Sequence, residues 1–183
     1  MNKSKELEKI AEEIRKCRIC KKDKIGIAVP GEGDPDADVV FLGEAPGKEE
    51  AKTGRPFIGR SGKLLRELIR KAGLKEEAVF ITSPVKYLPK HGTPTLAEIV
   101  HGRKHLLDQL AVIQPQFAVL LGKVACIAVL GEAVEIGKRH GEVIAKDGMR
   151  YFLSYHPAAP LHSPKLRAEL LKDFRKLKRI LAA

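Results

Sequence analysis

Hydrophobic residues follow two kinds of pattern along this chain. Short continuous apolar runs are typical of strands buried on both faces, and they occupy 38–43, 79–82, 117–121 and 151–154. Apolar residues at helical spacing predict amphipathic helices, over 5–16, 62–72, 95–113 and the segment from Gly122 to about Gly131. A last helix is expected after Ser163-Pro164, because proline is favoured in the first helical turn.

Turn and capping signals divide these elements. Glycine and proline indicate loops over 25–37 and 44–61, and Asp147-Gly148 predicts the turn of a hairpin over 142–154. Thr95 followed by Glu98 is the pattern of a capping box. Strands that alternate with helices imply a mostly parallel sheet covered on both faces. We therefore expect one α/β domain over residues 1–183, a three-layer α/β/α sandwich around a mostly parallel four-stranded sheet.

Charge changes this picture of an ordinary globular domain. The 34 Lys and Arg against 23 Asp and Glu leave a net charge of +11, which suits a polyanion such as nucleic acid; a solvated basic surface is the alternative. The chain contains no apolar run long enough to span a membrane and no signal-peptide pattern. Its three cysteines do not form a secreted disulfide framework. We expect a cytoplasmic protein, monomeric and without a membrane partner.

Three polar residues directly follow predicted strands. Glu44 lies in a Gly-Glu-Ala-Pro-Gly turn, Ser83 follows 79–82, and His156 precedes a proline after the last strand. Open α/β sheets bind ligands beyond the carboxyl ends of their strands, so these residues are candidates for one site. Glu44 could orient water or stabilise a developing cation, and Pro157 would restrict the backbone of His156. The alternatives are a solvated carboxylate and a structural histidine.

Several longer motifs together resemble one known family, the family 4 uracil-DNA glycosylases, which form the iron–sulfur branch of the uracil-DNA glycosylase superfamily. The likeness extends in order and spacing from Cys17 to the C-terminal helix. The residues that carry it are Val29-Pro30-Gly31-Glu32-Gly33, Gly43-Glu44-Ala45-Pro46-Gly47, Thr53 to Leu65, Ile81-Thr82-Ser83-Pro84-Val85-Lys86, Leu121-Gly122-Lys123, Arg139-His140-Gly141 and His156-Pro157-Ala158-Ala159.

The resemblance implies an enzyme that flips a deaminated base, uracil first, out of DNA and hydrolyses its N-glycosidic bond. Such an enzyme leaves an abasic site and needs no cofactor for catalysis. By the family pattern, Glu44 is associated with the water or with the oxocarbenium-like transition state. His156 donates a hydrogen bond to uracil O2. Phe57 stacks on the base, although core packing is a commoner fate for phenylalanine. Gly43 and Ala45 contribute base contacts.

The same resemblance places further residues at the DNA. The loop after the His-Pro motif supplies a wedge that fills the gap left by the flipped nucleotide, and Leu161, next to Pro160, is the candidate. Arg60 and Lys86 are expected at the DNA backbone.

Ser83 departs from the family pattern. The family has asparagine here, which reads the uracil edge with two hydrogen bonds, a pairing worth roughly 1–3 kcal/mol of discrimination. A serine cannot reach as far. Relaxed specificity, a shift toward hypoxanthine or xanthine, or readout through a water therefore stay open.

The cysteines depart from the pattern as well. The family holds a [4Fe–4S] cluster with four cysteines, and Cys17 and Cys20 match the first two. The third position falls at Tyr87 and the fourth at Gly102. Two thiolates cannot hold the usual cluster, so we expect it to be lost.

Two histidines flank the fourth position. His101 and His105 are four residues apart on the expected helix, and with the two cysteines they would complete a Cys₂His₂ zinc site. The alternatives are a disulfide between the cysteines, or free thiols beside surface histidines.

A last alternative concerns His91, which precedes Gly92-Thr93-Pro94. One branch of the family forms a covalent adduct with DNA through a histidine in a similar loop. The longer basic segment of that branch is absent here. A covalent trap, or a non-catalytic binder of damaged DNA, is therefore the alternative to a glycosylase.

Overall fold

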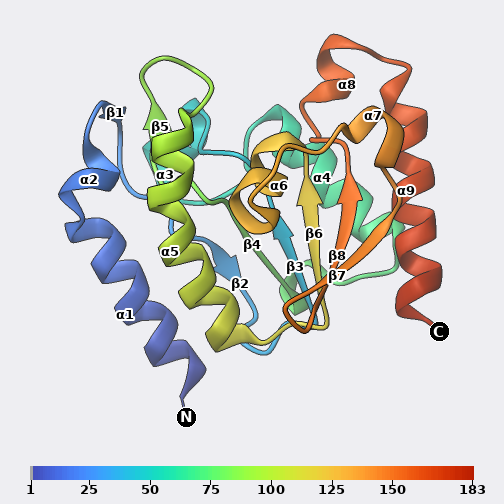
Figure 1. Cartoon of the computed structure of the whole chain (residues 1–183), viewed down its shortest axis with the longest axis horizontal. Coiled ribbons are helices and arrows are strands. Elements are labelled where there is room, and N and C mark those ends of the chain that lie inside the picture. The colour runs from blue at the N-terminus through green and yellow to red at the C-terminus, as the bar shows by residue number, and fades with distance from the viewer. Residues whose placement is uncertain (1) are drawn as a thin grey trace.

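The computed structural model describes residues 2–183. They form three layers, a central six-stranded sheet with helices on both faces (Figure 1). The strand order is β2-β4-β3-β6-β8-β7. The strands are β2 Glu32–Gly33, β3 Val39–Leu42, β4 Val79–Thr82, β6 Phe117–Leu121, β7 Val143–Lys146 and β8 Met149–Ser154. Two short strands, β1 Lys24–Ile25 and β5 Leu88–Pro89, form a separate antiparallel ribbon.

The four central strands confirm the expected parallel sheet. β4, β3, β6 and β8 all run parallel to their neighbours within this group. The expected count of four is too low, because an antiparallel strand pairs at each edge, β2 on β4 and β7 on β8. β2 has only two residues, one of them glycine, so it leaves no apolar pattern.

The helices of residues 2–183 follow the expected segments, with short helices added where none was expected. They are α1 Lys3–Lys16, α2 Arg18–Lys21, α3 Lys48–Thr53, α4 Arg60–Lys71, α5 Leu96–Ile113, α6 Lys123–Leu130, α7 Ile136–Arg139, α8 Ala159–His162 and α9 Leu166–Leu181. α3 lies inside the segment 44–61 that was expected to be loop. The last helix is preceded by α8 and starts at Leu166, after Pro164. The capping box of Thr95 and Glu98 is confirmed at the start of α5.

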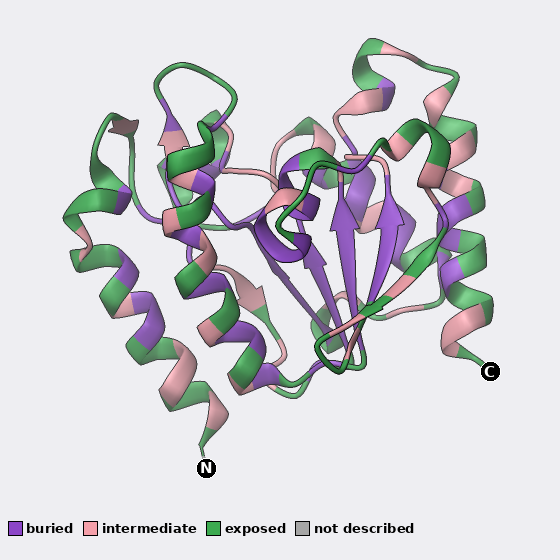
Figure 2. Ribbon diagram, in the orientation of Figure 1, coloured by how far each residue is buried: buried purple, intermediate pink, exposed green. Residues whose placement is uncertain are grey.

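Successive side chains of each strand point to opposite faces of the sheet, so each face has its own hydrophobic core. In β3, Val40 and Leu42 belong to the core shared with α5 and α6, whereas Val39 and Phe41 belong to the core shared with α4 and α9. Figure 2 shows the central strands buried along their length, with exposed residues on the outer sides of the helices. α1 packs against α5, outside the layer that α5 and α6 form on one face of the sheet.

The parallel strands place the candidate residues at one edge. The carboxyl ends of β3, β4 and β8 point the same way, and the arrowheads of β6 and β8 mark this edge at the top of Figure 1. Glu44, Ser83 and His156 follow these three strands within two residues. Within residues 2–183, no helix is both long and apolar enough to cross a membrane.

Candidate active site

A pocket of about 440 Å³ opens at the carboxyl edge of the sheet. The three residues that follow strands all line it, as the sequence predicted, together with Phe57 from the loop before α4. Its remaining lining residues are Val29, Ala45, Pro46, Gly47, Lys48, Glu49, Glu50, Pro56, Gly59, Arg60, Ser61, Ala158 and Leu161. The volume lies in the range of small-molecule sites, so a single base is a suitable occupant.

Glu44 supplies the carboxylate of this pocket. It is half-buried just after β3, and burial raises the pKa of its side chain above the usual value. A carboxylate with a raised pKa takes up a proton more readily than an exposed one. When ionised in a partly dry pocket, it also stabilises a nearby positive charge. Glu44 can therefore orient a water molecule and oppose a developing cation.

His156 presents a neutral hydrogen-bond donor. The backbone N–H of Ala158 donates to its Nδ1 at 3.1 Å, so Nδ1 is an acceptor and the ring proton resides on Nε2. Burial lowers the pKa of His156 to about 4, which keeps the imidazole neutral near pH 7. The free Nε2–H can donate to a carbonyl oxygen and strengthens that bond as the oxygen becomes anionic.

Phe57 forms an aromatic wall next to His156. The two ring centroids lie 5.8 Å apart with an interplanar angle of 33°. Gly43 is required beneath this wall, because a Cβ there would lie 2.4 Å from Cζ of Phe57 and 3.0 Å from Oγ of Ser83. The N–H of Gly43 donates to the Thr82 carbonyl at 2.9 Å. Gly43 thus contributes space for the base, and its amide is already bonded within the protein.

The loop that carries Phe57 is held by two residues that the sequence analysis missed. Phe57 has a left-handed backbone with φ of 51°, which is strained for a bulky residue. The buried Glu50 of α3 accepts from the N–H of Ile58 at 2.9 Å and of Gly59 at 2.8 Å. Arg66 of α4 donates to the carbonyl of Phe57 at 3.0 Å. Nothing in the sequence marks Glu50, because its helix lacks an apolar stripe.

The residues assigned to DNA separate into two groups. Leu161 is 40% exposed at the rim of the pocket, and Arg60 is exposed there too. This placement agrees with a wedge and a backbone contact. The expectation that Pro160 contacts DNA is corrected, because this residue of α8 is buried.

The expectation that Lys86 contacts the DNA backbone is wrong. Its side chain is fully buried, 1% exposed. Its Nζ donates to the Pro30 carbonyl at 3.1 Å, to Thr82 Oγ1 at 2.7 Å and to Gln109 Oε1 at 2.7 Å. Burial lowers the pKa of Lys86 to about 7. The residue therefore ties the end of β4 to α5 behind the pocket.

The predicted metal ligands meet at a different place. Cys17, Cys20, His101 and His105 each offer a ligand atom, and these atoms all lie within 4.8 Å of one another. Both cysteines are free thiols. None of the four lines the base pocket. His91 also lies elsewhere, at a hollow that it shares with Cys20 and His101, so the geometry gives no support to a covalent trap at the base.

Comparison with known proteins identifies the family of this chain. A model of the uracil DNA glycosylase superfamily matches residues 30–179. The chain is 38% identical to the type-4 uracil-DNA glycosylase of Sulfurisphaera tokodaii, over 95% of this chain and 84% of that protein. It is 39% identical to the type-4 uracil-DNA glycosylase of Thermotoga maritima, over 94% of this chain and 93% of that protein. The chain therefore belongs to the uracil-DNA glycosylase superfamily.

Proposed function

We propose that this protein is a DNA-repair glycosylase that removes uracil from DNA and leaves an abasic site. The observation that carries the proposal is the pairing of Glu44 with a neutral, Nε2-protonated His156 across one pocket at the sheet edge. The names of the relatives support the same activity. The net charge of +11 suits a polyanionic substrate.

The reaction assigns one task to each side chain. Extrusion of the nucleotide costs a few kcal/mol, which Phe57 offsets by stacking on the base while Leu161 fills the gap in the duplex. As the bond between C1′ and the base nitrogen breaks, the electron pair leaves with the base, and Nε2–H of His156 donates to its carbonyl oxygen. Glu44 stabilises the cationic sugar and orients the water whose oxygen bonds to C1′. The proton that this water loses passes to the Glu44 carboxylate, and from there to the released base anion or to solvent. These groups account for the hydrolysis without a cofactor.

Ser83 bears on which base is preferred. It is 7% exposed and lines the pocket beside Gly43. One hydroxyl offers one donor and an acceptor, enough for a single contact to the uracil edge or for a bridging water. Uracil remains the proposed substrate. Hypoxanthine and xanthine are the competing bases, and the substrate panel below decides between them.

The decisive experiment incubates the protein with oligonucleotides that each carry one uracil, hypoxanthine, xanthine or undamaged base, and cleaves abasic sites with alkali. We expect uracil to be excised fastest. Faster release of either purine would reassign the substrate. Failure on every lesion would contradict the glycosylase itself.

Two variants test the assigned groups. Glu44→Gln and His156→Ala should each lower the single-turnover rate on uracil by about 100-fold or more, because each removes a group that acts on the transition state. Circular dichroism should show an unchanged fold. The matched controls are Glu132→Gln and His91→Ala, exposed residues outside the pocket. Full activity in either active-site variant would show that the site is assigned wrongly.

The proposed substrate also decides the expected partners. We propose DNA that contains deaminated bases as the partner and the cytoplasm as the location. Each residue of the proposed mechanism comes from one chain, so we expect a monomer, which sedimentation can check. We also infer that the family's [4Fe–4S] cluster is absent, because Tyr87 and Gly102 stand at two of its ligand positions.

A further inference from the structure

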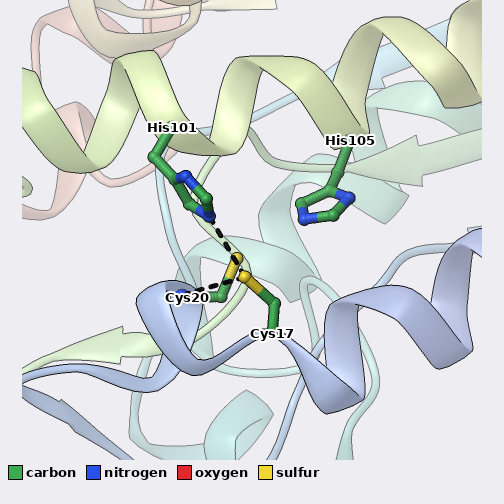
Figure 3. A group of neighbouring side chains, drawn as sticks. All are labelled: Cys17, Cys20, His101 and His105. Carbon is green, nitrogen blue, oxygen red and sulfur yellow. Dashed lines mark hydrogen bonds between the residues drawn. The ribbon is translucent and has the colours of Figure 1, made fainter.

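Two cysteines and two histidines converge from distant parts of the chain (Figure 3). Cys17 caps α2 and Cys20 lies within it, whereas His101 and His105 are one turn apart on α5. The Cys17 sulfur and His101 Nε2 are 3.2 Å apart. In Figure 3 the two imidazoles hang from α5 toward the two sulfurs below it.

The surroundings do not fit a cluster held by four thiolates. Tyr87 at the third position is buried and packs with Cys20, and its hydroxyl donates to the Ile14 carbonyl at 3.4 Å. A Cβ on Gly102 would lie 2.1 Å from the Pro84 carbonyl oxygen. The phenol occupies one ligand position, and the close contact between α5 and the Pro84 loop excludes any side chain at the other.

We propose that Cys17, Cys20, His101 and His105 bind a single zinc ion, which fastens the N-terminal helices to α5. Tetrahedral zinc, with Zn–S of about 2.3 Å and Zn–N of about 2.0–2.1 Å, places its ligand atoms about 3.3–3.8 Å apart. Ligand atoms within 4.8 Å of one another come into this range by small rotations of the side chains.

The chemistry of the four ligands selects the metal. Thiolate and imidazole together favour zinc over magnesium or calcium, which prefer oxygen. Two thiolates neutralise a divalent ion, and this suits a site where Cys20 and His105 are buried. Nδ1 of His105 is buried without a hydrogen-bond partner among residues 2–183. Metal ligation gives this ring a polar partner that the protein itself does not supply.

The site closes a long loop. Its two halves are separated by 84 residues between Cys17 and His101, and α5 contacts both α1 and α2. All four ligands come from the protein, as in structural rather than catalytic zinc sites. The inference does not depend on the glycosylase activity, since none of the four residues lines the base pocket.

The first test measures metal in the wild-type protein, purified without an affinity tag that binds metals. We expect about one zinc per chain by elemental analysis, with both thiols protected from Ellman's reagent until a chelator is added. Replacement with cobalt should give the visible bands of a tetrahedral thiolate site. Iron with acid-labile sulfide would overturn the proposal, and so would metal-free protein with two reactive thiols or a Cys17–Cys20 disulfide.

Variants then assign the ligands. His101→Ala and His105→Ala should each lose most of the zinc and melt at a lower temperature, whereas His101→Cys should retain it as a Cys₃His site. His91→Ala is the matched control, because this histidine borders the same region without belonging to the group. Retained zinc in both alanine variants, or zinc loss in the control, would refute this ligand set. If a variant fails to fold, the cobalt spectrum of the wild type still decides.

Discussion

At the scale of single residues, the proposed mechanism depends on the protonation states of Glu44 and His156. Burial moves the pKa of both side chains, that of Glu44 upward and that of His156 down to about 4. The neutral forms of both are favoured by the same loss of solvent. As acid is added, the Glu44 carboxylate therefore takes up its proton before the His156 ring does.

This difference predicts how activity depends on pH. The ionised form of Glu44 is the active one, and its raised pKa means that activity falls at a higher pH than for an ordinary glutamate as acid is added. The pKa of His156 is lower, about 4, so the first part of that loss reports Glu44. Single-turnover rates from pH 4.5 to 8 should show one acid limb in the wild type, and Glu44→Gln should be slow and flat. An acid limb that persists in this variant would assign the titration to another group.

Ser83 gives a second prediction at this scale. Ser83→Asn should raise the preference for uracil over cytosine by roughly tenfold, because an amide offers a donor and an acceptor to the base edge. The ratio of kcat/KM for matched oligonucleotides measures the effect. Ser61→Asn, on a residue that also lines the pocket, is the control. Equal ratios in wild type and Ser83→Asn would show that this position does not read the base.

At the scale of elements, burial decides how much the sequence could predict. β3, β4 and β6 are buried at every residue, so their apolar runs were visible. The position of Glu44 followed from β3, and that of His156 followed from the apolar end of β8, whose last four residues are buried. α3 was missed because its six residues include a single alanine among charged and polar ones. The environment of Lys86 was predicted wrongly, since its burial depends on Gln109, a partner 23 residues away.

Helix α3, which the sequence did not predict, yields a prediction of its own. Glu50→Ala on α3 leaves the N–H groups of Ile58 and Gly59 without their acceptor, which costs about 1–3 kcal/mol. The strained backbone of Phe57 can then relax away from the base, so kcat/KM on uracil should fall by about tenfold to 100-fold. Thermal unfolding and kinetics on the same preparation measure both effects.

Two further variants distinguish a positioning role of Glu50 from a general loss of stability. Glu50→Gln keeps one acceptor oxygen and should recover part of the activity. Glu77→Ala, on an exposed residue outside the pocket, should change neither quantity. If Glu50→Ala lowers stability and leaves kcat/KM unchanged, the helix does not hold Phe57 in place for catalysis.

At the scale of the whole molecule, charge and topology act together. The net charge of +11 attracts DNA at long range, and the parallel sheet brings the pocket, Arg60 and Leu161 to one edge. The C-terminal end of α9 lies toward the opposite edge (Figure 1). The proposed DNA contacts therefore lie at one edge of the molecule, although basic residues occur elsewhere too.

Salt dependence tests this polarity. Arg60→Gln should reduce the slope of log affinity against log salt by about 1, because one phosphate contact is lost. Arg179→Gln, at the far end of α9, removes the same charge and should leave the slope nearly unchanged. Titration of a uracil-containing duplex in the Glu44→Gln background avoids turnover during the measurement. Equal changes of the slope in both variants would mean that net charge, rather than a local contact at Arg60, determines the salt dependence.

The contact between Gly102 and Pro84 has an evolutionary consequence. A cysteine at position 102 would drive its Cβ to 2.1 Å from the Pro84 carbonyl oxygen, so the backbone of α5 or of the loop would first have to move. That loop begins with Ser83, in the base pocket. A cysteine at position 102 is therefore not tolerated as a single substitution, because the repacking needed to admit it would also disturb the loop that carries Ser83. The close packing of α5 against this loop thus restricts the substitutions that position 102 can accept.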